Sequence, residues 1–297
     1  MAIPSLKLII LTGSDTPQVR SCWASLRPWL AAQPGVRLVG EFTPSQAIPA
    51  ELDADMVVVL GGDGSILRGC RQLGARQLPI LGINLGRLGF LAELSPHEFQ
   101  AGLHLLCSGQ YSIIEHLMFQ CTHFDSTGVQ YCDLGLNEVT ITSGGSLKML
   151  DIDLRIDDEE VTTFSCDGLI ISTPVGSTAH NLSAGGPILR QELQVFTITP
   201  ICPHTLTVRP IVDSASRVYR LCVKESPSGV MLVIDGQIHR PLLATDHVVV
   251  QRAQPTLKLV RLPGYSYYGT LHRKLGWQGQ LDYRERRGGS RPGEFSE

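Results

Sequence analysis

The sequence predicts an α/β N-terminal domain with a parallel sheet over residues 1–110 and an all-β, sandwich-like C-terminal domain over residues 111–264. In the first part, aliphatic runs that are apolar on both faces alternate with helix-like stretches, which is typical of a parallel sheet covered by helices on both sides. In the second part, many short alternating segments are separated by turn residues, as in antiparallel sandwiches. The 297 residues also suffice for two domains of about 150 residues each.

The elements of the first part follow in order along the chain. The predicted strands are residues 6–11, 56–60 and 78–83. Residues 17–32 carry apolar positions at helical spacing, and Pro28 is expected to end or kink that helix. A second helix is predicted after residue 64, with Ser65 as its capping residue and Ile66, Leu67 and Cys70 on its apolar face.

The second part reads as a series of short β-strands. The segments rich in Ile, Val, Leu and Thr are 112–121, 136–142, 149–156, 205–212, 217–223, 229–234, 247–252 and 256–261. Turn signals at 157–160, 227–229 and 235–236 separate them. Residues 265–277 look helical again, and the tail 283–297 has almost no apolar content, which predicts disorder.

Composition argues against several classes of protein. The net charge is −3 and no basic stripe precedes the tail, so a nucleic-acid partner is not expected. The longest apolar runs are far shorter than the roughly 20 residues of a membrane span, and the N-terminus shows no secretory signal pattern. The eight cysteines form no Cys-x-x-Cys pair, which favours reduced thiols in a cytoplasmic protein over a zinc site.

The most informative stretch is the glycine-rich segment that follows the predicted strand 56–60. Gly61, Gly62 and Gly64 would stand at the carboxyl end of a parallel sheet, where backbone N–H groups and a helix N-terminus bind phosphates. Asp63 lies among them and is a candidate general base or Mg²⁺ ligand. The alternative is a strand-to-helix turn in which Asp63 hydrogen-bonds only backbone. Neither a Walker A motif nor Gly-x-Gly-x-x-Gly is present.

Three further stretches carry polar residues at predicted strand ends. Residues 82–91 combine three glycines with Phe90. Residues 136–141 place Asn137 and Glu138 between apolar residues. Residues 167–187 form a strand, a turn rich in Gly, Ser and Thr, a short helix and a double-glycine exit.

Together these segments resemble the NAD kinases, which phosphorylate the 2′-hydroxyl of the adenosine ribose of NAD with ATP. The resemblance spans roughly residues 56–265. It depends on the GGDG segment (61–64), on Asn137-Glu138, and on the TPVGSTAHNLSAGG segment (173–186). Residues 199–204 and Asp235-Gly236-Gln237 add to it. GGDG alone is shared with diacylglycerol-type and sphingosine kinases and with phosphofructokinases, whereas the later segments are more specific.

The resemblance implies a Rossmann-like or phosphofructokinase-like N-terminal domain and a β-rich C-terminal domain, with residues 265–282 packing back on the first. It implies ATP and NAD as substrates, Mg²⁺ as the divalent metal, a cytoplasmic location, and a homodimer or homotetramer. Asp63 would be the base, and the glycines 61, 62 and 64 would bind phosphates. The NAD contacts would come from Phe90, Asn137, Glu138, Asp167, Thr178, Ala179, His180 and Ser183. Two positions depart from the family: Ser65 replaces the usual Thr, and His180 replaces a common Tyr.

The residues themselves leave alternatives open. Arg68, one turn into the predicted helix, is either the cation for phosphoryl transfer or part of a solvated face. Asn137 and Glu138 are adjacent, so both serve one site only if the strand is distorted or ends there. Asp167 either contacts NAD or caps a turn. Asp235 is either a residue at the margin of the NAD site, as the resemblance implies, or part of an ordinary Asp-Gly hairpin turn.

Two other functions are compatible with the glycine segment. A lipid or sugar kinase would share GGDG, although the chain lacks the amphipathic basic helix expected of a lipid-facing enzyme. A non-catalytic NAD-binding regulator would keep the fold, although Asp63 is retained.

Overall fold

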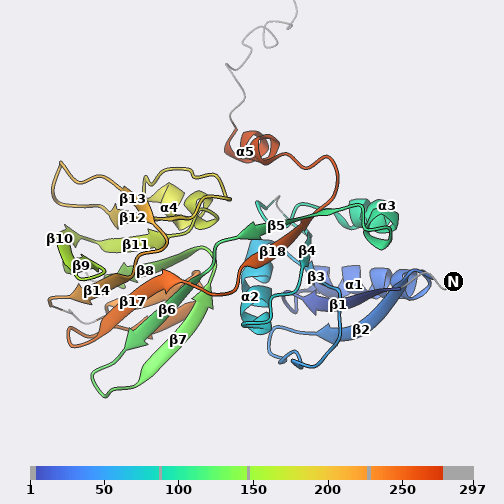
Figure 1. The fold of residues 1–297 in the computed structure, drawn as a ribbon, viewed down its shortest axis with the longest axis horizontal. Coiled ribbons are helices and arrows are strands. Elements are labelled where there is room, and N and C mark those ends of the chain that lie inside the picture. The colour runs from blue at the N-terminus through green and yellow to red at the C-terminus, as the bar shows by residue number, and fades with distance from the viewer. Residues whose placement is uncertain (1–4, 87–88, 146–147, 226–228, 277–297) are drawn as a thin grey trace, which may run out of the picture. The chain divides into compact units, whose positions relative to one another are not determined.

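The computed structural model describes residues 5–86, 89–145, 148–225 and 229–276, so the tail 283–297 lies outside the described residues. The chain divides into two units, residues 1–263 and 264–297. The larger unit holds one mixed α/β sheet and two antiparallel sheets (Figure 1). In the smaller unit, α5 (Tyr267–Leu275) is capped by the Ser266 hydroxyl and is followed by Gly276 at φ +65°. The packing of residues 265–282 against the first domain stays a prediction.

The α/β sheet combines the N-terminal strands with two strands from later in the chain. Its order is β2-β1-β3-β4-β18-β5. The strands are β1 (Leu6–Thr12), β2 (Val36–Phe42), β3 (Met56–Leu60), β4 (Ile80–Ile83), β5 (Ser112–His116) and β18 (Leu257–Arg261). Neighbours run parallel up to β18, and β5 is antiparallel to β18. Residues 112–116 and 257–261 were predicted to belong to the β-rich C-terminal domain. They instead pair in the first sheet, as β5 and β18.

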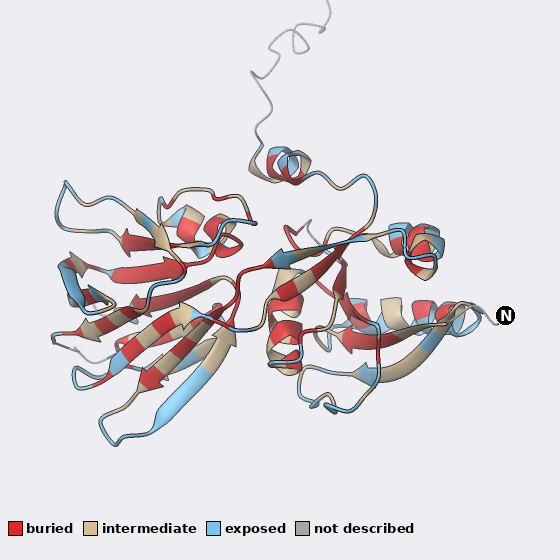
Figure 2. Cartoon of the chain, in the orientation of Figure 1, coloured by how far each residue is buried: buried red, intermediate tan, exposed pale blue. Residues whose placement is uncertain are grey.

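Helices cover both faces of this sheet, as the doubly apolar strands predict. One face packs against α1 (Pro17–Ala31) and α3 (Pro96–Cys107), and the other packs against α2 (Asp63–Leu73). Every residue of β3 is buried, so this strand is red throughout in Figure 2. The helix containing Pro28 does not end there, because α1 continues to Ala31.

The other two sheets are antiparallel and enclose a separate apolar core. Their orders are β10-β9-β14-β17-β6-β7 and β13-β12-β11-β8-β15-β16. The first contains β6 (Phe119–Phe124), β7 (Gln130–Gly135), β9 (Leu150–Ile156), β10 (Glu159–Cys166), β14 (Tyr219–Val223) and β17 (His247–Arg252). The second contains β8 (Glu138–Thr142), β11 (Gly168–Ser172), β12 (Val195–Ile201), β13 (Ile211–Ser214), β15 (Met231–Ile234) and β16 (Ile238–Pro241). The predicted sandwich is confirmed.

Two local details of this region bear on function. The strand predicted at 205–212 is wrong for most of its length, because β13 begins only at Ile211. Between β11 and β12 lie a 3₁₀ turn, η1 (Gly176–Thr178), and the short helix α4 (His180–Ser183).

All eight cysteines are free thiols. No helix within the described part of the chain is long and apolar enough to cross a membrane.

Candidate functional site

The glycine segment forms a tight turn between β3 and the N-terminus of α2. Gly61 has φ +148°, and a Cβ there would lie 2.3 Å from the Ser65 hydroxyl oxygen. The helix begins at Asp63, with Gly62 as its N-cap and no side-chain cap. The prediction that Ser65 caps the helix is wrong, because its side chain instead fills the space left by Gly13 and Gly61. Ser65 N and Ile66 N donate to the carbonyl oxygen of Gly62. The N–H groups at the very start of a helix have no carbonyl four residues earlier in the helix, so this turn can bind an anion.

The Asp63 carboxylate is anchored to the backbone of residues 90–92. Oδ2 accepts a hydrogen bond from Phe90 N at 2.7 Å, and Oδ1 accepts from Leu91 N and Ala92 N at 3.0 Å each. A Cβ at Gly89 would lie 1.9 Å from Oδ1, so glycine is needed there. The alternative in which Asp63 contacts backbone is therefore observed. Oδ2 can still accept a further hydrogen bond or a proton, because it accepts only one of these three bonds.

The two arginines of α2 reach different parts of the structure. Arg68, half-buried, donates to the carbonyl oxygen of Gly13 at the end of β1, so it is not merely part of a solvated face. Arg71 donates to Asp235 Oδ2 at 3.2 Å and to the side-chain oxygen of Gln237. Arg71 was not among the residues predicted for the site. Its signal was the spacing of Gly64, Arg68 and Arg71 at i, i+4 and i+7, which places them on one helix face.

Asp235 organises the start of β8. Its carboxylate is fully buried and accepts hydrogen bonds from the N–H groups of Leu136, Asn137 and Glu138 at 2.7–3.2 Å. Burial raises the pKa of Asp235, while these N–H bonds and the Arg71 charge oppose that rise. Asp235 has φ +51°, as in an ordinary Asp-Gly turn. The turn nevertheless holds the predicted NAD-contact segment in place.

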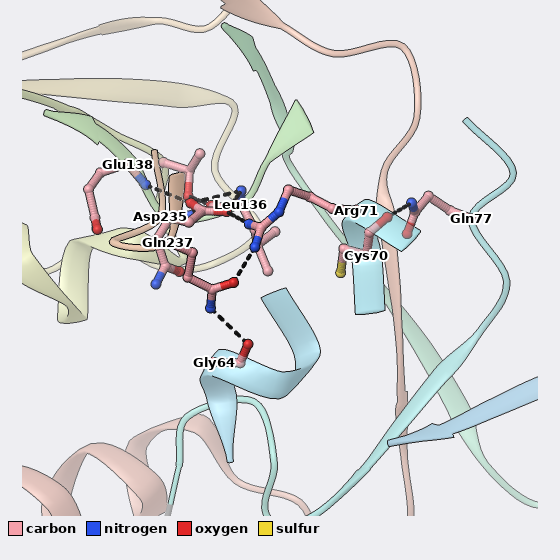
Figure 3. A network of polar contacts seen from close by, with 10 residues as sticks. Gly64, Cys70, Arg71, Gln77, Leu136, Glu138, Asp235 and Gln237 are labelled. Carbon is pink, nitrogen blue, oxygen red and sulfur yellow. Dashed lines mark hydrogen bonds and ion pairs between the residues drawn. The ribbon is translucent and has the colours of Figure 1, made fainter. Parts of the chain in front are cut away.

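Gln237 links this turn to the glycine segment. Its amide nitrogen donates to the carbonyl oxygen of Gly64 at 2.9 Å, and its amide oxygen accepts from Arg71. Figure 3 shows the resulting network, in which Asp235 and Gln237 lie between α2 and the strand that begins at Glu138. Through it, the structure brings Gly64, Asn137, Glu138 and Asp235 together.

Asn137 and Glu138 both belong to this region because β8 begins at Glu138. Asn137 precedes the strand, so the alternation of strand side chains does not separate the pair. Its carbonyl oxygen accepts from Thr173 N at 2.9 Å and from the Ser172 hydroxyl at 3.2 Å. A Cβ at Gly176 would lie 2.1 Å from that same oxygen. The 173–176 segment is therefore packed directly against the start of β8.

Glu138 is a buried acid with an unusual protonation state. Burial, followed by the nearby Asp235 charge, raises its pKa to about 8, although a backbone hydrogen bond from His180 opposes the rise. Its Oε2 is buried and has no hydrogen-bond partner. At pH 7 Glu138 is therefore mainly neutral, and its carboxyl group can donate a hydrogen bond to a ligand.

This protonation predicts a pH-dependent stability. The folded-state pKa lies above the unfolded value, so folding takes up a proton, and stability falls as pH rises from about 4.5 to about 8. The side chain of Glu138→Gln cannot ionise, so its free energy of unfolding does not carry this pH dependence. The free energy of unfolding of the variant minus that of the wild type should therefore rise by ~2 kcal/mol between pH 5.5 and pH 7.5. Urea unfolding of both proteins at the two pH values measures this. An equal difference at both values would contradict the assigned protonation.

The residues between Gly176 and Gly186 that were predicted to contact NAD differ in how far they are exposed. Thr178 and Ala179 are half-buried, whereas His180 and Ser183 are exposed. Between them, the fully buried Asn181 donates to the carbonyl oxygens of Ser177 and Pro187 and accepts from the hydroxyls of Thr197 and Thr199. This role of Asn181 was not predicted, since nothing in the local sequence pattern distinguishes it from a turn residue.

Asp167 does not join this cluster. In the β8–β11 ladder, Ser172 pairs with Glu138 and Gly168 pairs with Thr142. Asp167 therefore lies beyond the opposite end of β11, about 16 Å from Ser172 at ~3.3 Å per strand residue. Its side chain is exposed, and its backbone N–H donates to Ile201 O. Contact of Asp167 with NAD stays a prediction.

Comparison with known proteins identifies the family. The chain matches the ATP-NAD kinase N-terminal domain over residues 15–111 and the ATP-NAD kinase C-terminal domain over residues 136–262. It is 46% identical to the NAD kinase of Rhodopirellula baltica over 94% of this chain and 89% of that protein. It is 37% identical to the NAD kinase of Geobacter sulfurreducens over 91% of this chain and 98% of that protein.

Solved structures share the fold. A crystal structure of yeast NADH kinase complexed with NADH matches with a TM-score of 0.83 and 24% identity, covering 94% of this chain and 90% of that one. An NAD kinase from Archaeoglobus fulgidus in complex with ATP matches with a TM-score of 0.68 and 27% identity, covering 91% and 98%. Because both ATP-NAD kinase domains match, the chain is an NAD kinase rather than a lipid kinase, a sugar kinase or a non-catalytic regulator. The chain belongs to the NAD kinase family and is an enzyme that phosphorylates NAD to NADP with ATP.

Proposed function

We propose that the phosphoryl group goes to the 2′-hydroxyl of the adenosine ribose of NAD and that Asp63 accepts the proton of that hydroxyl. The observation that carries this proposal is the geometry of the Asp63 carboxylate. Three backbone N–H groups fix its orientation at the N-terminus of α2, while Oδ2 accepts only one of those bonds. A rigidly held carboxylate beside an anion-binding turn is suited to general base catalysis during phosphoryl transfer.

The reaction then proceeds by one displacement. The ribose oxygen forms a bond to the γ-phosphorus of ATP, and the bond from that phosphorus to the oxygen bridging the β- and γ-phosphates breaks. The hydroxyl proton passes to Asp63 Oδ2, and ADP leaves with the bridging oxygen. Gly61, Gly62 and Gly64 bind phosphate oxygens through the helix N-terminus, and Arg68 supplies a cation one turn away.

The NAD side of the site is formed by the start of β8 and the segment after β11. Asn137 and the neutral carboxyl of Glu138 donate hydrogen bonds to the adenosine part, and Phe90 packs nearby. The contacts with the rest of NAD come from Thr178, Ala179, His180 and Ser183. Support comes from the Asp235 network, which fixes Asn137 and Glu138 next to Gly64.

The residues fit a magnesium ion that arrives with the nucleotide. Within the described ranges, no group of three or more His, Cys, Asp or Glu side chains could hold a metal. Mg²⁺ is commonly bound largely by substrate phosphates and waters, so the ion needs no cage of protein carboxylates beside the phosphate-binding turn. When bound, the ion neutralises charge on the transferring phosphate.

We also propose a homodimer or homotetramer located in the cytoplasm. The oligomer is what membership of the NAD kinase family implies, and Leu206, with 90% of its surface exposed, offers one apolar contact. The eight free cysteines suit a reducing compartment.

Deoxy analogues of NAD test the acceptor position. The analogue that lacks the 2′-hydroxyl of the adenosine ribose should bind, inhibit competitively and yield no phosphorylated product. The analogue that lacks only the 3′-hydroxyl should be phosphorylated, because its 2′-oxygen is intact. Mass spectrometry of the products measures both results. Phosphorylation of the 2′-deoxy analogue would contradict the proposed acceptor.

A further inference from the structure

A buried arginine holds the opposite side of the backbone segment that anchors Asp63. Arg261 is the last residue of β18, and only 5% of its surface is exposed. Its guanidinium donates to Leu91 O at 3.1 Å and to Phe90 O at 3.0 Å. It also forms an ion pair with Glu93 at 3.1 Å.

The contacts of Arg261 and Asp63 converge on the same two peptide groups. The peptide between Phe90 and Leu91 accepts from Arg261 through its C=O and donates to Asp63 Oδ1 through its N–H. The peptide between Leu91 and Ala92 repeats this arrangement. Two amides therefore connect the guanidinium to one oxygen of the carboxylate. The other oxygen, Oδ2, is bonded by Phe90 N.

This arrangement has an electrostatic consequence. A positive donor at an amide oxygen polarises the amide and strengthens its N–H as a donor, since hydrogen bonds in a chain reinforce one another in a low-dielectric interior. Strong bonds to Oδ1 fix the plane of the carboxylate and therefore the direction of Oδ2. Arg68 and Arg71 donate elsewhere, to Gly13 and to Asp235 and Gln237.

The charge of Arg261 is balanced locally. Glu93 is its ion partner. On the neighbouring strand β5, Arg261 pairs with Ser112, and its charge also acts on His116, which lies four residues further along that strand. Burial, followed by the Arg261 charge, lowers the pKa of His116 to about 4, so His116 is neutral near pH 7. His116 therefore adds no second positive charge near the guanidinium at pH 7.

We propose that Arg261 is a positioning residue for Asp63, acting through the peptide groups at residues 90–92. The proposal rests on the assigned role of Asp63 as the base. Arg261 does not touch a substrate in this scheme. It fixes and polarises the amides that aim the Asp63 carboxylate, and it couples the last strand of the α/β sheet to the reacting oxygen.

A double-mutant cycle tests the coupling. Arg261→Met should lower kcat ~10-fold, with KM for NAD and ATP changed less than about threefold. In an Asp63→Asn background the same substitution should lower the residual kcat less than about twofold, because the carboxylate it positions is gone. Arg261→Lys, which keeps the charge, should recover part of the loss. NADP formation is measured by enzymatic cycling, which detects the slow variants.

Arg240→Met removes a largely buried arginine paired with Asp133 in the C-terminal sheets, and it should lower stability without lowering kcat. An equal loss for Arg261→Met in both backgrounds, or a change confined to KM, would overturn the positioning role alone. Near-normal turnover of Asp63→Asn by itself would overturn the base role. If Arg261→Met does not fold, Arg261→Lys is used in the same cycle.

Discussion

Asp63→Asn is expected to lower kcat at least ~10²-fold while the KM for NAD changes little. The amide has nearly the shape of the carboxylate, so its oxygen can still accept from Leu91 N and Ala92 N. It cannot take up the proton of the ribose hydroxyl. The loss should therefore fall on the chemical step, and steady-state rates of NADP formation with varied NAD and ATP would measure it.

The control for this substitution is Asp55→Asn. Asp55 also accepts a backbone hydrogen bond, from Lys7 N at 2.7 Å, but it lies on the surface away from the glycine segment. Its variant should keep the wild-type kcat. A kcat of Asp63→Asn within about threefold of wild type would contradict the base role, and an increased KM with unchanged kcat would make Asp63 a binding residue.

Asp235→Asn is expected to destabilise the fold by ~3 kcal/mol and to raise the KM for NAD. The substitution leaves Arg71 without its counter-charge and places an NH₂ group among N–H donors that now compete for a single oxygen. Asn137 and Glu138 lose their fixed position as a result. Urea unfolding at pH 7 measures the stability, and initial rates measure the KM.

Asp158→Asn provides the matched comparison for Asp235. Asp158 lies in the exposed β9–β10 hairpin turn, so its variant should stay within about 0.5 kcal/mol of wild type. If Asp235→Asn were equally mild, Asp235 would be an ordinary turn residue after all. The KM for NAD in both variants then shows whether the start of β8 depends on this carboxylate.

Local sequence patterns predicted where individual strands lie better than they predicted which strands pair in a sheet. The run Met56–Leu60 is apolar on both faces and gave the right strand, because burial on two sides leaves a continuous signal. The strand at Leu257–Arg261 was also predicted, but not its place beside β4. Its pairing depends on contacts between segments far apart in the chain, and no local periodicity encodes those.

The same limit applies to the site. Gly61 and Asp63 were found because a glycine-rich turn after a buried strand has a specific chemical use. The Asp235-Gly236 turn has the same local signal whether or not its carboxylate binds a distant strand. Arg261 carries no signal at all, since an arginine at a strand end is ordinarily solvated. These roles exist only once the chain is folded.

The place of β18 in the first sheet affects how the protein is made. Because β18 lies between β4 and β5, the nascent N-terminal domain lacks an internal strand until synthesis has passed residue 261. The strands of the sandwich, by contrast, are all complete at residue 252. Translation therefore completes the strands of the two antiparallel sheets first. The first sheet becomes complete only when β18 pairs between β4 and β5.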